Sequence, residues 1–202
     1  MTDCPVEIKT TNRRVINQLE TRKRLLDAAR EAVVQYGYQS ASIMDIVNLA
    51  GFTKGAFFSN FKNKESILLE LMRIQKQEDI ELLGSYIALA DGDIVVALDQ
   101  YISTLDQRRD CAILDIELQL YARSNPDFAH SYYKIQDENR SAMGNLLENI
   151  FAKKNKSIPM KPTELADLFL ALVQGTALQN NLKAGFFVNK VLSSLIETSL
   201  EF

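Results

Sequence analysis

The residues best suited to chemistry lie between Ser42 and Lys64, where hydroxyl, small and lysine side chains alternate with large apolar ones. Thr53 is followed by Lys54, Gly55 and Ala56. A helical Gly costs about 1 kcal/mol relative to Ala, so a purely structural helix would not usually carry Gly55 on its outer face. Small side chains do let a helix backbone enter the major groove of DNA, and lysines bind phosphate. The pattern therefore favours non-covalent recognition of DNA.

Short elements must position these residues. Ser42 and Asp45 form a capping-box pattern that predicts a helix starting at Ser42, and Gly51 is placed to end it. Thr53 can cap a second helix running to about Asn60, and the spacing is that of a DNA-binding helix-turn-helix.

The large side chains and the next helix fit the same scheme. Phe57 and Phe61 lie four residues apart, and we expect them to pin the second helix to the core. Asn63 is expected to cap a long third helix. Lys64 opposes the dipole of that helix, which makes sense if a phosphate group binds there.

These motifs resemble the TetR/AcrR family of bacterial transcriptional repressors, whose pattern is close to T-v-x-x-I-A-x-x-A-G-v-s-k-G-t-l-Y-x-x-F-x-s-K-e. Residues 21–38 also resemble the family's first helix, so the resemblance covers about 45 of the 202 residues. The matching positions are Ser42, Ile46, Ala50, Gly51, Phe52, Thr53, Lys54, Gly55, Phe61, Lys64 and Glu65.

Three positions depart from the family pattern. Val47 replaces an alanine, Ser42 replaces a threonine and keeps the hydroxyl, and Phe58 replaces a tyrosine. The missing hydroxyl of Phe58 would remove a contact with the DNA backbone, at a cost of about 1 kcal/mol, although the ring can still pack on a thymine methyl group.

The resemblance implies a role for each matching residue. Phosphate contacts fall to Ser42, Thr53 and Lys64, with Asn60 as a further candidate. The positions that can face bases are Met44, Lys54, Gly55, Ala56 and Phe58. The alternatives are that the lysines are merely solvated and that Met44 and Phe58 serve hydrophobic packing.

The charge distribution supports DNA as a partner although the net charge is −3. Residues 1–64 hold ten Lys or Arg and six Asp or Glu, whereas residues 65–202 hold thirteen and twenty. One end of the chain is thus suited to meet phosphate. The basic residues before and within the first helix are Lys9, Arg13, Arg14, Arg22, Lys23 and Arg24.

Composition excludes several other classes of protein. Cys4 and Cys111 sit in unlike contexts and suggest no disulfide framework, and Cys111 is expected to be a small core residue. No apolar run approaches the roughly 20 residues of a membrane span, and no signal-peptide core is present, so we expect a cytoplasmic protein. Lone His130, with no phosphate-binding Gly loop and no metal-ligand spacing, argues against an enzyme, a cofactor or a metal site.

The periodicity of the whole chain predicts an all-α fold of about nine helices. After the helix that runs from Lys64 towards Ala90, the predicted helices are 94–107, 111–124, 126–154, 163–183 and 187–200. The predicted domains are a flexible extension over 1–19, a helix-turn-helix domain over 20–65, and a helical effector-binding and dimerisation domain over 66–202.

The resemblance assigns two roles to the C-terminal domain. The last two helices would form a four-helix dimer interface, although an ordinary intrachain core is the alternative; the candidates are Leu168, Leu172, Gly175, Thr176, Leu192, Leu195 and Ile196. The middle helices would enclose an effector pocket, although core packing competes at every position; the candidates are Met72, Tyr86, Tyr101, Leu105, Tyr121, Phe128, Tyr132 and Met143.

The function that follows is a homodimeric, ligand-responsive repressor that binds a pseudo-palindromic double-stranded operator and is released by a small, largely apolar effector. It needs no cofactor and no membrane. The alternative is a helical protein-interaction module whose helix-turn-helix has lost DNA binding, which Phe58 makes conceivable.

Overall fold

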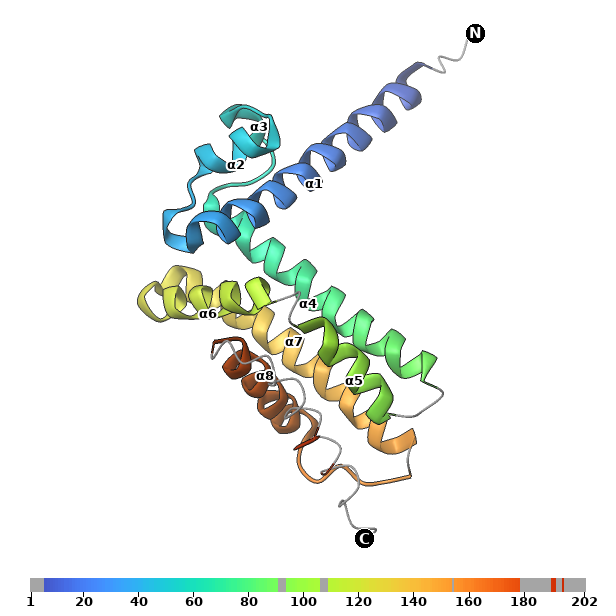
Figure 1. Ribbon diagram of the computed structural model, residues 1–202. Coiled ribbons are helices and arrows are strands. Elements are labelled where there is room, and N and C mark those ends of the chain that lie inside the picture. The colour runs from blue at the N-terminus through green and yellow to red at the C-terminus, as the bar shows by residue number, and fades with distance from the viewer. Residues whose placement is uncertain are drawn as a thin grey trace. The chain divides into compact units, whose positions relative to one another are not determined.

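The computed structural model describes residues 6–90, 94–105, 109–153, 155–178, 190–191 and 194, and every regular element within these ranges is helical (Figure 1). The predicted all-α class is therefore confirmed. Eight helices, α1 to α8, are defined over the described residues. The expected final helix, 187–200, lies outside them apart from residues 190, 191 and 194. The chain divides into two compact units, Met1–Leu71 and Met72–Phe202.

Helix α1 (Val6–Ser40) opens the first unit and includes residues 6–19 of the predicted N-terminal extension. The structure continues the helix back to Val6, because no Gly or Pro interrupts the chain between Val6 and Tyr36. Gly37 then breaks the helix with a φ of 77°, a conformation that glycine adopts without steric cost.

The helix-turn-helix consists of α2 (Ile43–Ala50) and α3 (Lys54–Phe58). The predicted capping box at α2 is confirmed, since the Ser42 hydroxyl accepts from the Asp45 amide and the Asp45 carboxylate accepts from the Ser42 amide. Gly51 ends α2 with a φ of 69°, as predicted. Thr53 caps α3 through the amide of Ala56.

Helix α4 (Lys64–Leu89) begins in the first unit and continues into the second. Asn63 caps it as predicted, because its Oδ1 accepts the Ser66 amide at 2.9 Å. Ile67, Leu68 and Leu71 are almost fully buried. The first two turns of α4 thus belong to the first unit, which ends at Leu71.

The second unit contains the rest of α4 with α5 (Ile94–Leu105), α6 (Arg109–Ser124), α7 (Pro126–Lys153) and α8 (Pro162–Leu178). Helices α7 and α8 pack side by side, and α6 packs on both (Figure 1). The hydrophobic core joins α4, α5, α7 and α8; its largest fully buried members include Leu83, Phe151 and Phe169.

The described part of the chain contains neither a membrane-spanning helix nor a cluster of metal-binding side chains. None of its helices combines the length and apolar character needed to cross a bilayer. Nor do its His, Cys, Asp and Glu side chains gather anywhere in a group of three or more that could hold a metal ion.

Candidate functional site

The turn between α2 and α3 is held in shape by the first helix. The amide of Phe52 donates to the Val47 carbonyl at 2.9 Å, which closes the turn after Gly51. Arg24 of α1 donates from Nη2 to the Ala50 carbonyl at 2.7 Å, and its guanidinium lies 4.5 Å from the centre of the Phe52 ring. The tight turn is therefore positioned by a cation on α1 as well as by its own backbone.

Helix α3 has one buried face and one exposed face. Phe57 is fully buried and lies 5.8 Å, centre to centre, from the nearly buried Phe61, as the sequence predicts. Lys54 and Gly55 are exposed. Phe58 contacts the edge of Phe57 yet remains 55% exposed. A small, basic and aromatic surface thus faces away from the core of this unit.

The exposed residues extend this surface onto α2. Met44 is 43% exposed, so neither Met44 nor Phe58 is a buried core residue. Ser42 is exposed too, but its Oγ donates to the Asp45 carboxylate at 2.6 Å within the capping box. Hydrogen bonds from Ser42 also hold the pKa of Asp45 below its usual value. We name Ser42, Met44, Thr53, Lys54, Gly55, Ala56 and Phe58 the reading surface.

Lys64, a predicted phosphate contact, is engaged within the protein. Its ammonium donates to the carbonyls of Tyr38 at 2.9 Å and Ala41 at 3.0 Å, with a longer contact to Gln39 at 3.4 Å. It also lies 4.7 Å from the centre of the Tyr38 ring. Burial lowers the pKa of Lys64. The three N–H groups of this lysine are therefore used to hold the end of α1, whose last carbonyls have no helical partners.

Asn60 is likewise engaged within the protein. Its Nδ2 donates to the Ala56 carbonyl at 2.8 Å, and its own backbone carbonyl accepts from Arg22 Nη1 at 2.6 Å. Arg22 also pairs with Glu70 and lies 4.2 Å from the centre of the Phe61 ring. The sequence marks Arg22 and Arg24 only as basic charge, whereas the structure uses both as internal braces. Local sequence spacing does not reveal these contacts, because the partners of Arg22 lie up to 48 residues away along the chain.

A cavity in the second unit is the other candidate site. The space between its walls is about 710 Å³ when the part open to solvent is counted, and about 70 Å³ of it admits the centre of a water-sized sphere. Of the predicted pocket residues, Met72, Tyr101 and Met143 line it. Burial raises the pKa of Tyr101 to about 12, so its hydroxyl stays protonated at neutral pH. The lining also includes Gln75, Lys76, Asp79, Cys111, Ala112, Leu114, Asp115, Asn139, Phe169, Leu170, Val173 and Gln174.

Tyr86, Tyr121, Phe128 and Tyr132 are not among the described residues that line this cavity. Tyr121, Phe128 and Tyr132 form an aromatic cluster. Tyr121 meets the Phe128 ring edge to face at 5.0 Å between ring centres, and Phe128 stacks on Tyr132 at 6.0 Å. Tyr86 packs against the hydrophobic core. The side chain of Leu105 lies outside the described part of the structure. Cys111, expected in the core, is instead half-buried at the cavity wall. Helical periodicity identifies the apolar faces of these helices, but it does not show which side chains of neighbouring helices pack on them.

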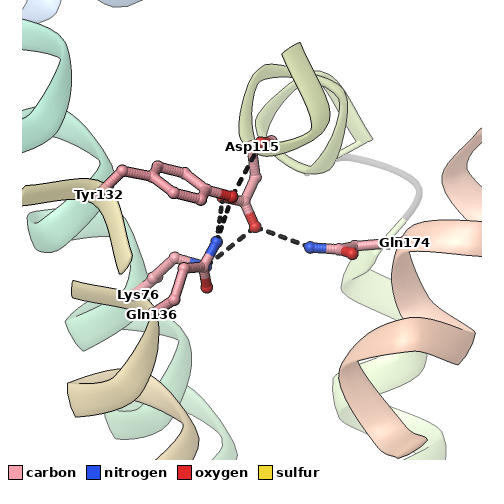
Figure 2. A network of polar contacts seen from close by, with 5 residues as sticks. All are labelled: Lys76, Asp115, Tyr132, Gln136 and Gln174. Carbon is pink, nitrogen blue, oxygen red and sulfur yellow. Dashed lines mark hydrogen bonds and ion pairs between the residues drawn. The ribbon is translucent and has the colours of Figure 1, made fainter. Parts of the chain in front are cut away.

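A polar network lies at the wall of the cavity, centred on the carboxylate of Asp115 (Figure 2). Lys76 and Gln174 donate to its Oδ2 at 3.0 and 2.8 Å. Gln136 and Tyr132 donate to its Oδ1 at 2.8 and 3.1 Å. Burial and the nearby carboxylate raise the pKa of Tyr132. The network joins α4, α6, α7 and α8, and the sequence gives no local signal for it.

The predicted dimer interface is described only in part. On α8, Leu168 is 38% exposed, and Leu172 and Gly175 are half-buried. The side chain of Thr176 and the residues Leu192, Leu195 and Ile196 lie outside the described part of the structure.

Known proteins resemble both the sequence and the fold. Residues 25–71 match the family model described as bacterial regulatory proteins, tetR family. The chain is 30% identical over 111 residues to an HTH-type transcriptional repressor of Mycobacterium tuberculosis, covering 55% of this chain and 56% of that protein. It is 39% identical over 61 residues to the TetC protein of transposon Tn10 from Escherichia coli, covering 30% and 31%. The match confirms the resemblance inferred from the helix-turn-helix.

The first of these relatives is matched over only about half its length, as is a transcriptional regulator of Bacillus subtilis. Solved structures are similar over nearly the whole chain. FadR of Bacillus subtilis in complex with stearoyl-CoA has a TM-score of 0.66 at 20% identity, covering 89% of this chain and 99% of that one. Reduced NemR of Escherichia coli has a TM-score of 0.69 at 16% identity, covering 87% and 96%. At these identities the likeness establishes the fold alone.

Proposed function

We propose that this protein is a ligand-responsive, sequence-specific transcriptional regulator, since residues 25–71 match the family model of bacterial regulatory proteins, tetR family. The observation that carries the proposal is the reading surface. A capped helix of five residues exposes Lys54, Gly55 and Phe58 while Phe57 anchors it from behind. This arrangement suits insertion of α3 into a major groove.

The residues of the reading surface divide the work on DNA. Lys54, Gly55, Ala56, Phe58 and Met44 face the bases, while Thr53 and Ser42 lie at helix N-termini where phosphate binds. Asn60 contributes chiefly by shaping the end of α3. Lys64 acts on DNA through the end of α1 that it holds, in place of the direct phosphate contact predicted from the sequence.

The active form is a homodimer that represses transcription by occupying a pseudo-palindromic operator. Two copies of α3 related by a two-fold axis would read major grooves roughly 34–36 Å apart. The proposed dimer surface includes the exposed Leu168 on α8. A small effector in the cavity of the second unit would favour a conformation that binds the operator poorly. No catalytic step is required of the protein.

An electrophoretic mobility-shift assay with DNA from upstream of the protein's own coding sequence tests this function. We expect a shift that persists against an excess of unrelated DNA and that weakens steeply as salt rises, because lysine contacts release counterions. Lys54→Ala should change which sequences are preferred. If wild-type protein shows no sequence-selective, salt-sensitive shift, the regulator proposal is wrong.

The second candidate, a protein-interaction module without DNA binding, draws support from Phe58. This exposed ring lacks the family hydroxyl and is an apolar patch on α3. The substitution Phe58→Tyr distinguishes the DNA-binding regulator from the protein-interaction module. For a DNA-binding protein the added hydroxyl should tighten binding by about 1 kcal/mol, whereas for an interaction module it should leave DNA binding absent.

A further inference from the structure

The cavity of the second unit presents polar groups that the fold itself does not use, and we propose that it binds an uncharged amphiphile whose polar head is a hydrogen-bond acceptor. The carbonyl group of an amide, ester or ketone is the chemistry that fits. This inference rests on the ligand-responsive regulator proposed above and specifies the class of its effector.

Two buried amides supply the first argument. Gln75 of α4 is 9% exposed and Asn139 of α7 is 7% exposed, and both line the cavity. Within the described residues, neither side-chain amide has a hydrogen-bond partner. Polar groups inside a protein are nearly always hydrogen-bonded, so two unpaired amides at the wall of one cavity are available to a bound molecule.

The Asp115 network supplies the second argument. Its carboxylate accepts hydrogen bonds from four side chains (Figure 2), which uses the capacity of both oxygens. Lys76 spends one of its three N–H groups on this carboxylate, and among the described residues the other two have no acceptor. The polar wall of the cavity therefore has more free hydrogen-bond donors than free acceptors. This favours a ligand whose head group accepts hydrogen bonds.

The charges at the wall exclude an ionic head group. Among the described lining residues the charged ones are Lys76, Asp79 and Asp115. Asp115 already offsets Lys76 at 3.0 Å, so a buried carboxylate of the ligand would find no excess of positive charge to replace its hydration. Asp79 has an interaction within the protein and Asp115 is fully used, so a cationic head would find no free carboxylate. An uncharged acceptor meets neither penalty.

The rest of the lining accounts for the apolar body of the ligand. Tyr101, Met143 and Phe169 are almost fully buried, and each contributes ring, thioether or alkyl surface to the cavity. Methionine adapts to ligands of irregular shape. An alkyl chain or small ring attached to a carbonyl therefore matches the whole wall, and not only its polar part.

Isothermal titration calorimetry on the full chain at pH 7 tests the inference with four probes of similar shape: decanamide, 2-undecanone, decanoate and decylammonium. We expect decanamide and 2-undecanone to bind at least tenfold more tightly than the two ions. Equal affinity for decanoate and decanamide would overturn the proposal. So would the absence of binding by all four probes from protein that still shifts its promoter DNA. Binding of decanamide without any DNA shift would support the ligand class and overturn the regulator proposal instead.

Substitution of the two amides tests the mechanism of recognition. Gln75→Leu and Asn139→Leu should each weaken decanamide binding about tenfold. Neither should lower the melting temperature of the ligand-free protein, because each removes an amide that makes no hydrogen bond to the described residues. Asn145→Leu is the matched control, since Asn145 is exposed on the same helix as Asn139. If both cavity variants bind decanamide as the control does, the assignment is wrong.

A charge variant gives an independent readout. Asp115→Asn should leave the charge of Lys76 without its counter-ion and raise the affinity for decanoate relative to decanamide at least tenfold. An unchanged ratio in folded protein would contradict the charge argument. If this variant does not fold, the two amide variants still decide the proposal.

Discussion

At the scale of single residues, the two lysines of the helix-turn-helix have different environments although the sequence presents them alike. Lys54 is exposed in the first turn of α3, whereas the ammonium of Lys64 donates to backbone carbonyls at the end of α1. A lysine that satisfies buried carbonyls contributes to folding, and a solvated one is available to a ligand. The roles of the two side chains in DNA binding should therefore be separable.

Lys64→Gln should lower the free energy of unfolding by roughly 1–3 kcal/mol, because carbonyls near Gly37 lose their donor. Lys54→Gln should change stability by less than about 0.5 kcal/mol, as at other exposed sites. Urea unfolding monitored by circular dichroism measures both effects. Equal stabilities of the two variants would contradict the role of Lys64 in holding the end of α1.

The DNA-binding readout of the same pair is the dependence of affinity on salt. For a direct phosphate contact at Lys64, the Gln variant should reduce the salt slope by about one unit. We expect an unchanged slope for folded Lys64→Gln and an altered sequence preference for Lys54→Gln. A slope reduced at Lys64 would show that its ammonium leaves the α1 carbonyls when DNA binds.

At the scale of elements, two glycines show how helix packing in the second unit depends on side-chain volume. Gly144 of α7 lies against the start of α8, where an added Cβ would come within 2.9 Å of the backbone of Pro162. Gly84 of α4 has nothing within 4 Å of the same position. The two residues occupy helix interiors, so their intrinsic helix propensities are equal and only their surroundings differ.

Gly144→Ala should destabilise the protein by about 1–3 kcal/mol, because backbone atoms of α8 must move to admit the methyl group. Gly84→Ala should instead stabilise it by up to about 1 kcal/mol, since Ala is the better helix former. Thermal unfolding of both variants beside the wild type measures the difference. Similar melting temperatures would mean that α7 and α8 separate without cost.

At the scale of the whole molecule, the proposed function needs two copies of the chain. The N-terminal 64 residues carry the excess of basic residues and the remainder the excess of acidic ones, which directs phosphate to the end that holds the reading surface. One copy of α3 contacts too few bases for a long operator, so a two-fold partner would double the recognised sequence. The exposed Leu168 on α8 is the described residue at which this assembly can be tested.

Leu168→Glu should convert a dimer to a monomer and abolish tight operator binding, because a charge buried in an apolar interface without a partner is strongly unfavourable. Leu120→Glu is the matched control, since Leu120 is even more exposed but lies on α6. Sedimentation velocity at micromolar concentration gives the readout. A monomeric wild type, or a dimer that tolerates Leu168→Glu, would contradict the proposed interface.

The sequence by itself determined the local structure of the helix-turn-helix. The caps at Ser42, Thr53 and Asn63 and the left-handed turn at Gly51 all formed where the residue types indicated. Such signals are reliable because a cap and its partner lie within three or four residues of each other. The buried anchors Phe57 and Phe61 were predictable for the same reason.

Only the tertiary structure decided which polar groups meet across the fold. Lys64 reaches carbonyls more than 20 residues earlier, and Asp115 collects donors from three other helices. Helical periodicity states which face of a helix is apolar, but it does not state which neighbouring side chain lies opposite. For that reason the sequence named Met72, Tyr101 and Met143 as pocket residues yet missed the Asp115 network and the amides of Gln75 and Asn139, on which the proposed ligand class depends.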